Sequence, residues 1–286
     1  MEPTICVVVT YFRKGELLRD ALLSVSEQLH EGDELIVVDD ASGDGIAEGM
    51  VAEACQTMRA QHRLIVSRSN RGAAAAKNLA IRASTREVIC LLDADDVLPA
   101  GALQTVRRTF ADFPDADFVF GDYLIEVPGS SELVSCKQVT APDGWLDVSK
   151  HFKDWRVLGS SPFRRRVVDR IGLLNESRPR TDDVDWQSVA MSRGLRFRYV
   201  SEIIYVWVRQ ESGNNSSRSL RDNFRSAVHR TPLIIRSSEH WPAVIRRMAL
   251  SLLIQSLPTS IATIVRRMRS HLLRSSHRNL DSLDPR

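Results

Sequence analysis

Three aspartates follow a run of apolar residues in the stretch VICLLDADDVLP, residues 88–99. Like charges this close together repel one another, and each carboxylate loses favourable hydration at the end of a buried strand. Paired carboxylates can hold Mg²⁺ or Mn²⁺ against the phosphates of a ligand, because both cations prefer oxygen ligands. The stretch therefore indicates a place to which positive charge must be brought.

Polar side chains also follow two other apolar runs. Thr10 and Tyr11 come after ICVVV, and the residues DDAS, 39–42, come after LIVV. An aromatic ring can stack on a base, and a carboxylate can accept a hydrogen bond from a base N–H group or a ribose hydroxyl. These residue types favour a nucleotide as the ligand.

Apolar runs and helical patterns alternate about four times in the first 110 residues. Runs rich in Val, Ile and Leu without polar alternation are typical of strands buried on both faces. Parallel strands open a crevice at their carboxyl ends, so ligands should bind there. The predicted strands are Ile5–Thr10, Leu35–Asp39, Arg63–Ser67 and Val88–Leu92, and the predicted helices include 17–29 and Gly72–Ser84.

The pattern changes after this first part of the chain. DFVFGDYLIEV and ELVSCKQV follow each other without a clear helix, so we expect the sheet to become mixed there. Farther along, Asp182–Arg193 predicts an amphipathic helix, and RFRYV and IIYVWV predict two strands. From about Leu220 onward the pattern is helical.

The composition is that of an ordinary folded protein. The 286 residues are 43% hydrophobic and 26% charged, which allows a sizeable core. The four cysteines lack metal-site or redox spacing and predict buried, reduced thiols. The sequence shows neither a secretory signal pattern nor a run of about eighteen apolar residues. We therefore expect a protein of the cytoplasm or of a cytoplasmic membrane face.

Four motifs in chain order, VVVTYF, IVVDDASGD, NRGAAAAKNLAI and LLDADD, resemble those of the inverting family 2 glycosyltransferases. The resemblance implies an α/β GT-A fold, with a Rossmann-like mixed central sheet flanked by helices and a C-terminal helical appendage. The expected glycosyltransferase domain covers 1–218, with a nucleotide-binding half of about 1–125 and an acceptor half of about 126–218. A basic helical region is expected over 219–286.

The resemblance places the donor nucleotide on the first two strand ends. Tyr11 would stack on the base and Thr10 would contact it, although only the middle pair of the family's Pro-Thr-Tyr-Asn is kept. Asp39 and Asp40 correspond to paired aspartates that contact base and ribose. The alternatives are that Tyr11 is only a core aromatic and that the aspartates form an Asx turn.

Ala76-Lys77-Asn78 stands where the family has Ala-Arg-Asn. The resemblance implies that Lys77 and Asn78 bind the nucleotide sugar, with Lys77 as a point charge for the diphosphate and Arg71 sharing this task. The alternative for the charged pair is solvated charge on a helix face.

The DADD residues correspond to the family's Asp-X-Asp metal motif, which implies Mg²⁺ or Mn²⁺ on Asp95, with Asp93 as a second ligand nearer the ribose. TDDVDW resembles the family's Glu-Asp motif, with Asp182 in the glutamate's place, and implies that Asp183 is the catalytic base. The alternative is an acidic helix start favoured by the helix dipole. The family's Tyr-Arg-X-His segment lacks its histidine here, so Arg209 becomes a candidate phosphate clamp.

The C-terminal part of the chain is basic. Between residues 225 and 278 there are ten arginines and a single acid, Glu239. Apolar stripes that alternate with arginine pairs are typical of a helix at an anionic membrane surface. We expect peripheral attachment to the inner face of the cytoplasmic membrane; the alternative is packing on the catalytic domain. No aromatic interleaving or motif supports a nucleic-acid partner.

The resemblance thus predicts a metal-dependent inverting glycosyltransferase of the hexosyltransferase type. It would move a sugar from a nucleotide-diphosphate donor, UDP-linked, to a glycan or lipid-linked glycan in cell-surface polysaccharide synthesis. Two alternatives stay open: a nucleotide-sugar-binding protein without turnover, and a haloacid-dehalogenase-type phosphatase. The phosphatase motif also ends an apolar strand, but normally an early one, whereas three strand–helix units precede it here.

Overall fold

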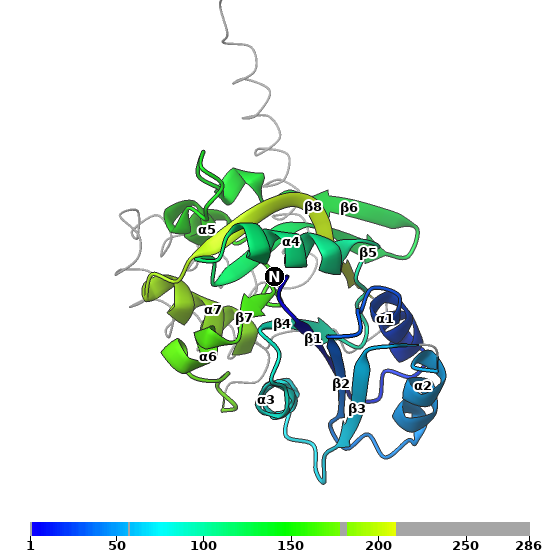
Figure 1. Ribbon diagram of the computed structural model, residues 1–286. Helices are drawn as coiled ribbons and strands as arrows, with labels where there is room; N and C mark the ends of the chain where they lie inside the picture. The colour runs from blue at the N-terminus through cyan, green and yellow to red at the C-terminus, as the bar shows by residue number, and fades with distance from the viewer. Residues whose placement is uncertain (1, 57, 178–181, 210–286) are drawn as a thin grey trace, which may run out of the picture.

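The apolar runs lie at the centre of a mixed sheet (Figure 1). The computed structural model describes residues 2–56, 58–177 and 182–209, and within them eight strands join this sheet. The strands are β1 (Ile5–Tyr11), β2 (Glu34–Asp39), β3 (Gln61–Val66), β4 (Val88–Asp93), β5 (Phe118–Val127), β6 (Ser130–Val134), β7 (Phe163–Arg164) and β8 (Phe197–Val208). Their order is β3-β2-β1-β4-β7-β5-β6, and β8 pairs with β5.

The first four strands are parallel, as predicted. In the register of the sheet, Thr10 lies opposite both Val38 and Asp93, and Tyr11 lies opposite Asp39. Because neighbouring parallel strands end at the same edge, the polar residues after β1, β2 and β4 are brought to one side of the sheet.

Helices pack on both the sheet and one another (Figure 1). They are α1 (Leu17–Ser26), α2 (Ile46–Ala54), α3 (Ala73–Ala83), α4 (Ala102–Asp112), α5 (Val148–Asp154), α6 (Arg166–Ile171) and α7 (Asp182–Ser192). α1 and α2 lie side by side, α3 packs against β1 and β2, and α4 packs against β8. The alanines on the buried face of α3 allow the helix to approach the strands closely.

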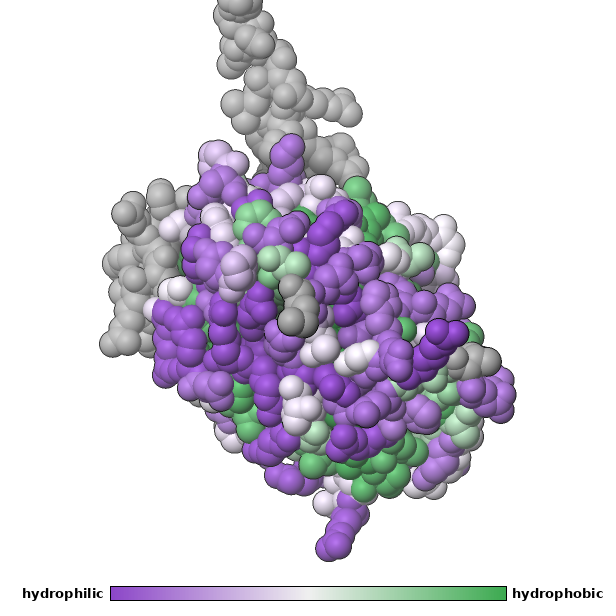
Figure 2. Space-filling view, in the orientation of Figure 1, coloured by the Kyte–Doolittle hydropathy of each residue, from purple (hydrophilic) through white to green (hydrophobic). Residues whose placement is uncertain are grey.

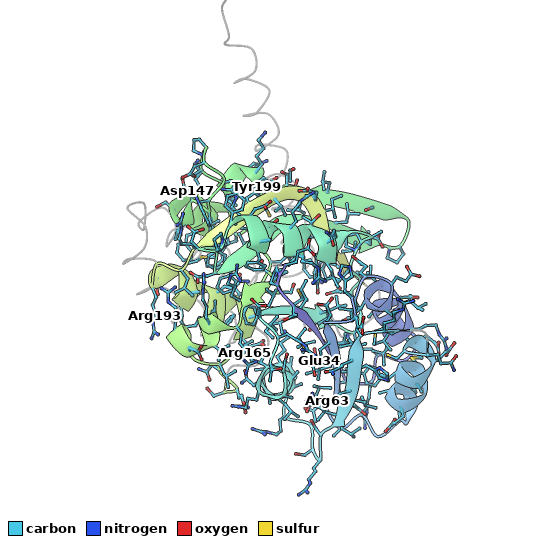
Figure 3. The ribbon with its side chains drawn as sticks, viewed as in Figure 1. Glu34, Arg63, Asp147, Arg165, Arg193 and Tyr199 are labelled. Atoms are coloured by element: carbon cyan, nitrogen blue, oxygen red, sulfur yellow. The ribbon has the colours of Figure 1, made fainter. Side chains whose placement is uncertain are left out.

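β3 is an edge strand rather than a strand buried on both faces, which corrects the prediction. It lies at the end of the strand order and most of its residues are exposed, including Val66. Figure 2 shows hydrophobic side chains on the surface near this strand. Arg63 on β3 reaches the buried Glu34 on β2, with 2.7 Å between Nη2 and Oε1, and both are labelled in Figure 3. Charge of this kind protects an exposed edge from pairing with another chain.

The second half of the sheet is mixed, as predicted, because β5 runs antiparallel to β6 and parallel to β8. RFRYV and IIYVWV, predicted as two strands, form the single strand β8. The ring of Phe118 on β5 stacks on that of Phe197 on β8, with 4.1 Å between centroids. At Gly121 the two backbones come so close that a Cβ would lie 2.8 Å from the Glu202 carbonyl oxygen. The elements α5, α6 and β7 had no counterpart in the prediction.

The helix predicted over Asp182–Arg193 is present as α7. The predicted domain boundary at 218, the basic region 219–286 and the membrane-binding stretch 225–278 lie outside the described residues. Among the residues that are described, no helix is both long enough and apolar enough to cross a bilayer.

Candidate active site

The three acids of the DADD loop have different surroundings. Asp93 ends β4 with 46% of its side chain exposed, whereas Asp95 is 13% exposed and forms an ion pair with Lys14. Asp96 is buried and accepts hydrogen bonds from the Tyr205 hydroxyl, at 2.7 Å, and the Val208 N–H, at 2.9 Å. Asp96 therefore fastens β8 to the loop, while Asp93 and Asp95 are left as candidate metal ligands.

Burial raises the pKa of Asp96 to about 8, and the negative charge of Asp93 adds to this effect. The hydrogen bonds from Tyr205 and Val208 favour the charged carboxylate but do not cancel the cost of burial. Asp96 is thus largely protonated at neutral pH and adds little negative charge to the loop.

A buried lysine links the DADD loop to the acidic start of α7. The side chain of Lys77, on α3, is 4% exposed. Its Nζ lies 3.5 Å from Oδ1 of Asp93, 3.7 Å from Oδ2 of Asp182 and 3.9 Å from Oδ2 of Asp183. The Thr10 hydroxyl donates to the same Asp93 oxygen at 3.1 Å. Candidate residues from distant parts of the sequence therefore form one group, which we call the Lys77 cluster: Lys77, Asp93, Asp182 and Asp183.

Charge is unbalanced in the Lys77 cluster. Burial opposes the charge of Lys77, but the carboxylates of Asp93, Asp182 and Asp183 outweigh it and raise the pKa of the ammonium. Burial also raises the pKa of Asp182 to about 6, against the opposing effect of Lys77. Oδ2 of Asp182 is buried and has no hydrogen-bond partner among the described residues. One ammonium faces three carboxylates, so the cluster keeps negative charge.

Asp183 lies in the first turn of α7 and packs on the backbone of Gly159. A Cβ on Gly159 would lie 2.4 Å from Cγ of Asp183, which explains why the position has no side chain. The carbonyls of Leu158 and Gly159 both accept hydrogen bonds from the Gln187 amide at 2.9 Å, so α7 also holds this loop. The Asp183 side chain is 24% exposed, and its carboxylate can be reached from solvent.

The residues predicted to contact the base and ribose support turns. The Tyr11 ring is 1% exposed and its hydroxyl donates to Asp44 at 2.7 Å. Burial, together with that bond, raises the pKa of Tyr11 to about 12. The ring is buried among protein groups in this structure, and its stacking on a base stays a prediction. Oδ1 of Asp39 accepts the Ser42 N–H, three residues on, at 2.8 Å, so this carboxylate holds the loop that follows β2.

Asp40 holds the turn that leads into α3. Its carboxylate accepts hydrogen bonds from the backbone N–H groups of Arg71, at 3.0 Å, and Gly72, at 2.7 Å. The Arg71 side chain forms an ion pair with Glu176, with 2.6 Å between Nη2 and Oε2. Arg71 thus contacts the chain segment before α7 and is not part of the Lys77 cluster.

Asn78 and Lys77 are turned toward protein groups. The Asn78 amide donates to the Leu174 carbonyl at 2.9 Å and to Glu176 at 3.0 Å, and accepts the Leu174 N–H at 3.0 Å. With both its amide N–H and its amide oxygen bonded, Asn78 fastens α3 to the 174–176 segment, and its contact with the nucleotide sugar stays a prediction. The Lys77 ammonium is likewise enclosed by carboxylates instead of open to a diphosphate.

Arg209 follows directly after β8. Its guanidinium carbon lies 5.1 Å from the centroid of the Trp207 ring, and its N–H donates to the Glu126 carbonyl at 2.7 Å. The preceding residue, Val208, donates its N–H to Asp96 of the DADD loop, so Arg209 lies next to a residue that contacts this loop. Its role as a phosphate clamp stays a prediction.

The candidate metal ligands fit Mg²⁺ or Mn²⁺. Asp93 and Asp95 offer carboxylate oxygens, and Mg²⁺ is commonly held by one or two carboxylates together with substrate phosphates. Within the described part of the chain, no group of three or more His, Cys, Asp or Glu side chains forms a complete protein ligand set. The Lys14 ammonium now holds the Asp95 carboxylate and would have to leave it for a cation.

Sequence reasoning missed Lys14, Gly159 and Glu176. Lys14 follows the first strand, so its place at the ligand-binding edge of the sheet was a usable signal. No local pattern marks Gly159 or Glu176, because their partners lie in distant parts of the sequence.

Part of the chain is similar to known proteins. The model of the family described as "Glycosyl transferase family 2" matches residues 6–163. Glycosyltransferase GlyG from Streptococcus pneumoniae serotype 4 is 30% identical over 123 residues, which are 43% of this chain and 40% of GlyG. Succinoglycan biosynthesis protein ExoU from Rhizobium meliloti is 25% identical over 236 residues, 79% of this chain and 65% of ExoU. The chain therefore spans less than two thirds of either relative.

Solved structures share the fold. The crystal structure of S. aureus TarS 1-349 in complex with UDP-GlcNAc has a TM-score of 0.67 at 15% identity, covering 86% of this chain and 71% of that one. Mannosyltransferase PcManGT from Pyrobaculum calidifontis, in complex with GDP-Man and Mn²⁺, has a TM-score of 0.60 at 19% identity. The match covers 99% of this chain and 84% of PcManGT. These likenesses confirm the predicted GT-A fold, and the family match excludes the phosphatase alternative. With the family model matching more than half of its length, the chain belongs to glycosyl transferase family 2.

Proposed function

We propose that this protein is a metal-dependent inverting glycosyltransferase that uses a UDP-linked sugar. Its acceptor would be a glycan or lipid-linked glycan in cell-surface polysaccharide synthesis. The observation that carries the proposal is the Lys77 cluster, in which one lysine lies within 3.9 Å of both Asp93 and Asp183. A donor held at the DADD loop would bring its anomeric carbon close to the Asp183 carboxylate.

The relatives support the choice of donor and pathway class. TarS was solved with UDP-GlcNAc, PcManGT with GDP-Man and Mn²⁺, and ExoU is named for succinoglycan biosynthesis. We choose the UDP-linked donor because the TarS structures have the higher TM-score.

In the proposed reaction Asp183 acts as the general base. Its carboxylate takes the proton of the acceptor hydroxyl while the acceptor oxygen forms a bond to the anomeric carbon. The bond from this carbon to the diphosphate oxygen breaks on the opposite face, and the nucleoside diphosphate leaves with the bonding electrons. Attack and departure on opposite faces invert the configuration of the sugar.

Asp93 and Asp95 are the proposed ligands of Mg²⁺ or Mn²⁺, which would supply positive charge to the departing diphosphate. The Thr10 hydroxyl fixes the orientation of the Asp93 carboxylate through its bond to Oδ1. Asp39 and Asp40 are proposed to shape the nucleotide site through the turns that they hold.

We also propose that residues 219–286 form a separate basic region and that 225–278 bind the inner face of the cytoplasmic membrane. The ten arginines and single acid between 225 and 278 support binding to anionic lipids. Flotation with anionic liposomes tests this part, and no binding at low salt would contradict it.

A thermal-shift panel of nucleotide sugars, with and without Mn²⁺, tests the donor and the metal together. We expect one UDP-sugar to raise the melting temperature, and only with the metal present. The variant Asp183→Asn should keep this stabilisation and retain only a small residual rate of sugar transfer, because the base is removed and the DADD loop is untouched.

The matched control is Asp169→Asn, an exposed acid on α6. It should keep both donor binding and transfer. A flat response of the wild type to every donor, or full transfer by Asp183→Asn, would contradict the proposed function.

A further inference from the structure

Lys77 is buried, and its ammonium forms ion pairs with protein carboxylates. Its side chain is 4% exposed, and its three ionic partners come from two elements that face each other across the site. Asp93 is the last residue of β4, and Asp182 and Asp183 are the first residues of α7. Lys77 is therefore a charged link between the strand end that would bind the donor and the helix that carries the proposed base.

The charges show what this link does. Three carboxylates within 3.9 Å of one nitrogen repel one another and are held together by the ammonium. If the ammonium is removed, Asp183 is repelled by Asp93 and by its neighbour Asp182. Repulsion and hydration then both favour a rotation of the Asp183 carboxylate away from the DADD loop and toward solvent.

Neighbouring contacts hold the backbone on both sides of this link. Asn78, the next residue on α3, bonds to the Leu174 backbone in both directions. The Trp186 indole N–H on α7 donates to the Gly172 carbonyl at 2.8 Å. These bonds tie α3 to Leu174 and α7 to Gly172. Oδ1 of Asp183 also accepts the Val184 N–H at 2.7 Å, within α7 itself. Lys77, which meets Oδ2, therefore bears on the side-chain position of Asp183 more than on the position of its backbone.

We propose that Lys77 is a positioning residue for Asp183, acting through the carboxylate of the base, and is not a ligand of the donor diphosphate. The proposal rests on the proposed function, since it assumes that Asp183 is the base. It replaces the role that a lysine at this place was predicted to have from the sequence.

A double-mutant cycle between Lys77 and Asp183 separates the two roles. If Lys77 acts through Asp183, Lys77→Gln should lower kcat by about 100-fold in the wild type, the cost of a misplaced catalytic group. In the Asp183→Asn background, Lys77→Gln should lower kcat by less than about threefold, because the base that Lys77 positions is already gone. An equal loss in both backgrounds would overturn the proposal.

A binding measurement gives a second and independent reading. The ratio of the affinity for UDP to the affinity for uridine should differ by less than about twofold between Lys77→Gln and the wild type. If Lys77→Gln loses tenfold or more in affinity for UDP but none for uridine, Lys77 is a ligand of the diphosphate. Lys137→Gln, at an exposed lysine, is the matched control for the loss of one positive charge. If Lys77→Gln does not fold, the double variant Lys77→Gln/Asp182→Asn replaces it, because only the carboxylates of Asp93 and Asp183 then repel each other. Its kcat and its affinities for UDP and uridine are measured in the same way.

Failure of this inference can be told apart from failure of the proposed function. No donor-dependent transfer by the wild type, or full transfer by Asp183→Asn, would remove the proposed function. The ratio of UDP to uridine affinity needs no turnover and still reports whether Lys77 contacts the diphosphate.

Discussion

Replacing Gly159 with alanine should displace the proposed base without touching any candidate ligand. A Cβ at this position would lie 2.4 Å from Cγ and Oδ2 of Asp183 and 2.9 Å from Oδ1. Nine in ten real Cβ contacts are longer than 3.4 Å, so the loop and the carboxylate must move apart by about 1 Å. Gln187 holds the loop from α7, so much of this movement falls on the Asp183 side chain.

The expected effect of Gly159→Ala is on the reaction rate. A misplacement of about 1 Å can lower a rate by about 100-fold, and overpacking of this kind costs about 1–3 kcal/mol of unfolding free energy. We therefore expect kcat to fall by about two orders of magnitude, with donor affinity nearly unchanged. Release of the nucleoside diphosphate measures kcat, and the donor-induced thermal shift measures binding.

The control for this substitution is Gly49→Ala on α2. A Cβ on Gly49 meets nothing within 4 Å, and alanine is favoured over glycine in a helix by roughly 0.5–1 kcal/mol. This variant should therefore be fully active and slightly more stable. If Gly159→Ala loses stability but keeps kcat within threefold of the wild type, the position of Asp183 does not limit the reaction and the reasoning is refuted.

Two further predictions concern charge pairs. Lys14→Met removes the ammonium that pairs with the Asp95 carboxylate. The variant should bind Mn²⁺, without nucleotide, on the order of tenfold more tightly in titration calorimetry. Unchanged or weaker binding, or the same gain in Lys137→Met, would contradict a competition between Lys14 and the metal. Arg107→Met leaves the buried Asp33 without the guanidinium that bonds to it at 2.6 Å and 3.2 Å, and should lower the unfolding free energy by about 3–5 kcal/mol in chemical denaturation. Arg108→Met, its exposed neighbour paired with Glu202, should cost about 1 kcal/mol or less, and equal losses in the two variants would refute the distinction.

The sequence predicts the parallel half of the sheet well, because an apolar run of four to six residues reports burial directly. The same run cannot report what lies on each side of it. β3 has the composition of a central strand, but it is the last in the order and most of it is exposed. The single strand β8 was divided in the prediction because the polar pair at 201–202 interrupts its apolar pattern.

The candidate site shows a similar division. The acids of the Lys77 cluster were found because their spacing and position at element ends are visible in the sequence. The contacts that Asp39, Asp40 and Asn78 make within the protein cannot be predicted in this way, because a carboxylate or amide can bind a ligand or hold the protein's own backbone. Which of these it does depends on whether distant backbone N–H groups, such as that of Gly72 for Asp40, fold back onto it.

The charge of the described site gives a physical reason for the proposed metal. Four carboxylates, those of Asp93, Asp95, Asp182 and Asp183, face two ammonium groups, those of Lys14 and Lys77. Asp96 adds little charge because its pKa is raised to about 8. A nucleoside diphosphate is itself an anion, so it would be repelled by the remaining negative charge if it arrived alone. A divalent cation that accompanies the diphosphate cancels most of its negative charge and can itself be bound by the carboxylates, so the repulsion is removed. Asp95 can receive this cation once Lys14 withdraws.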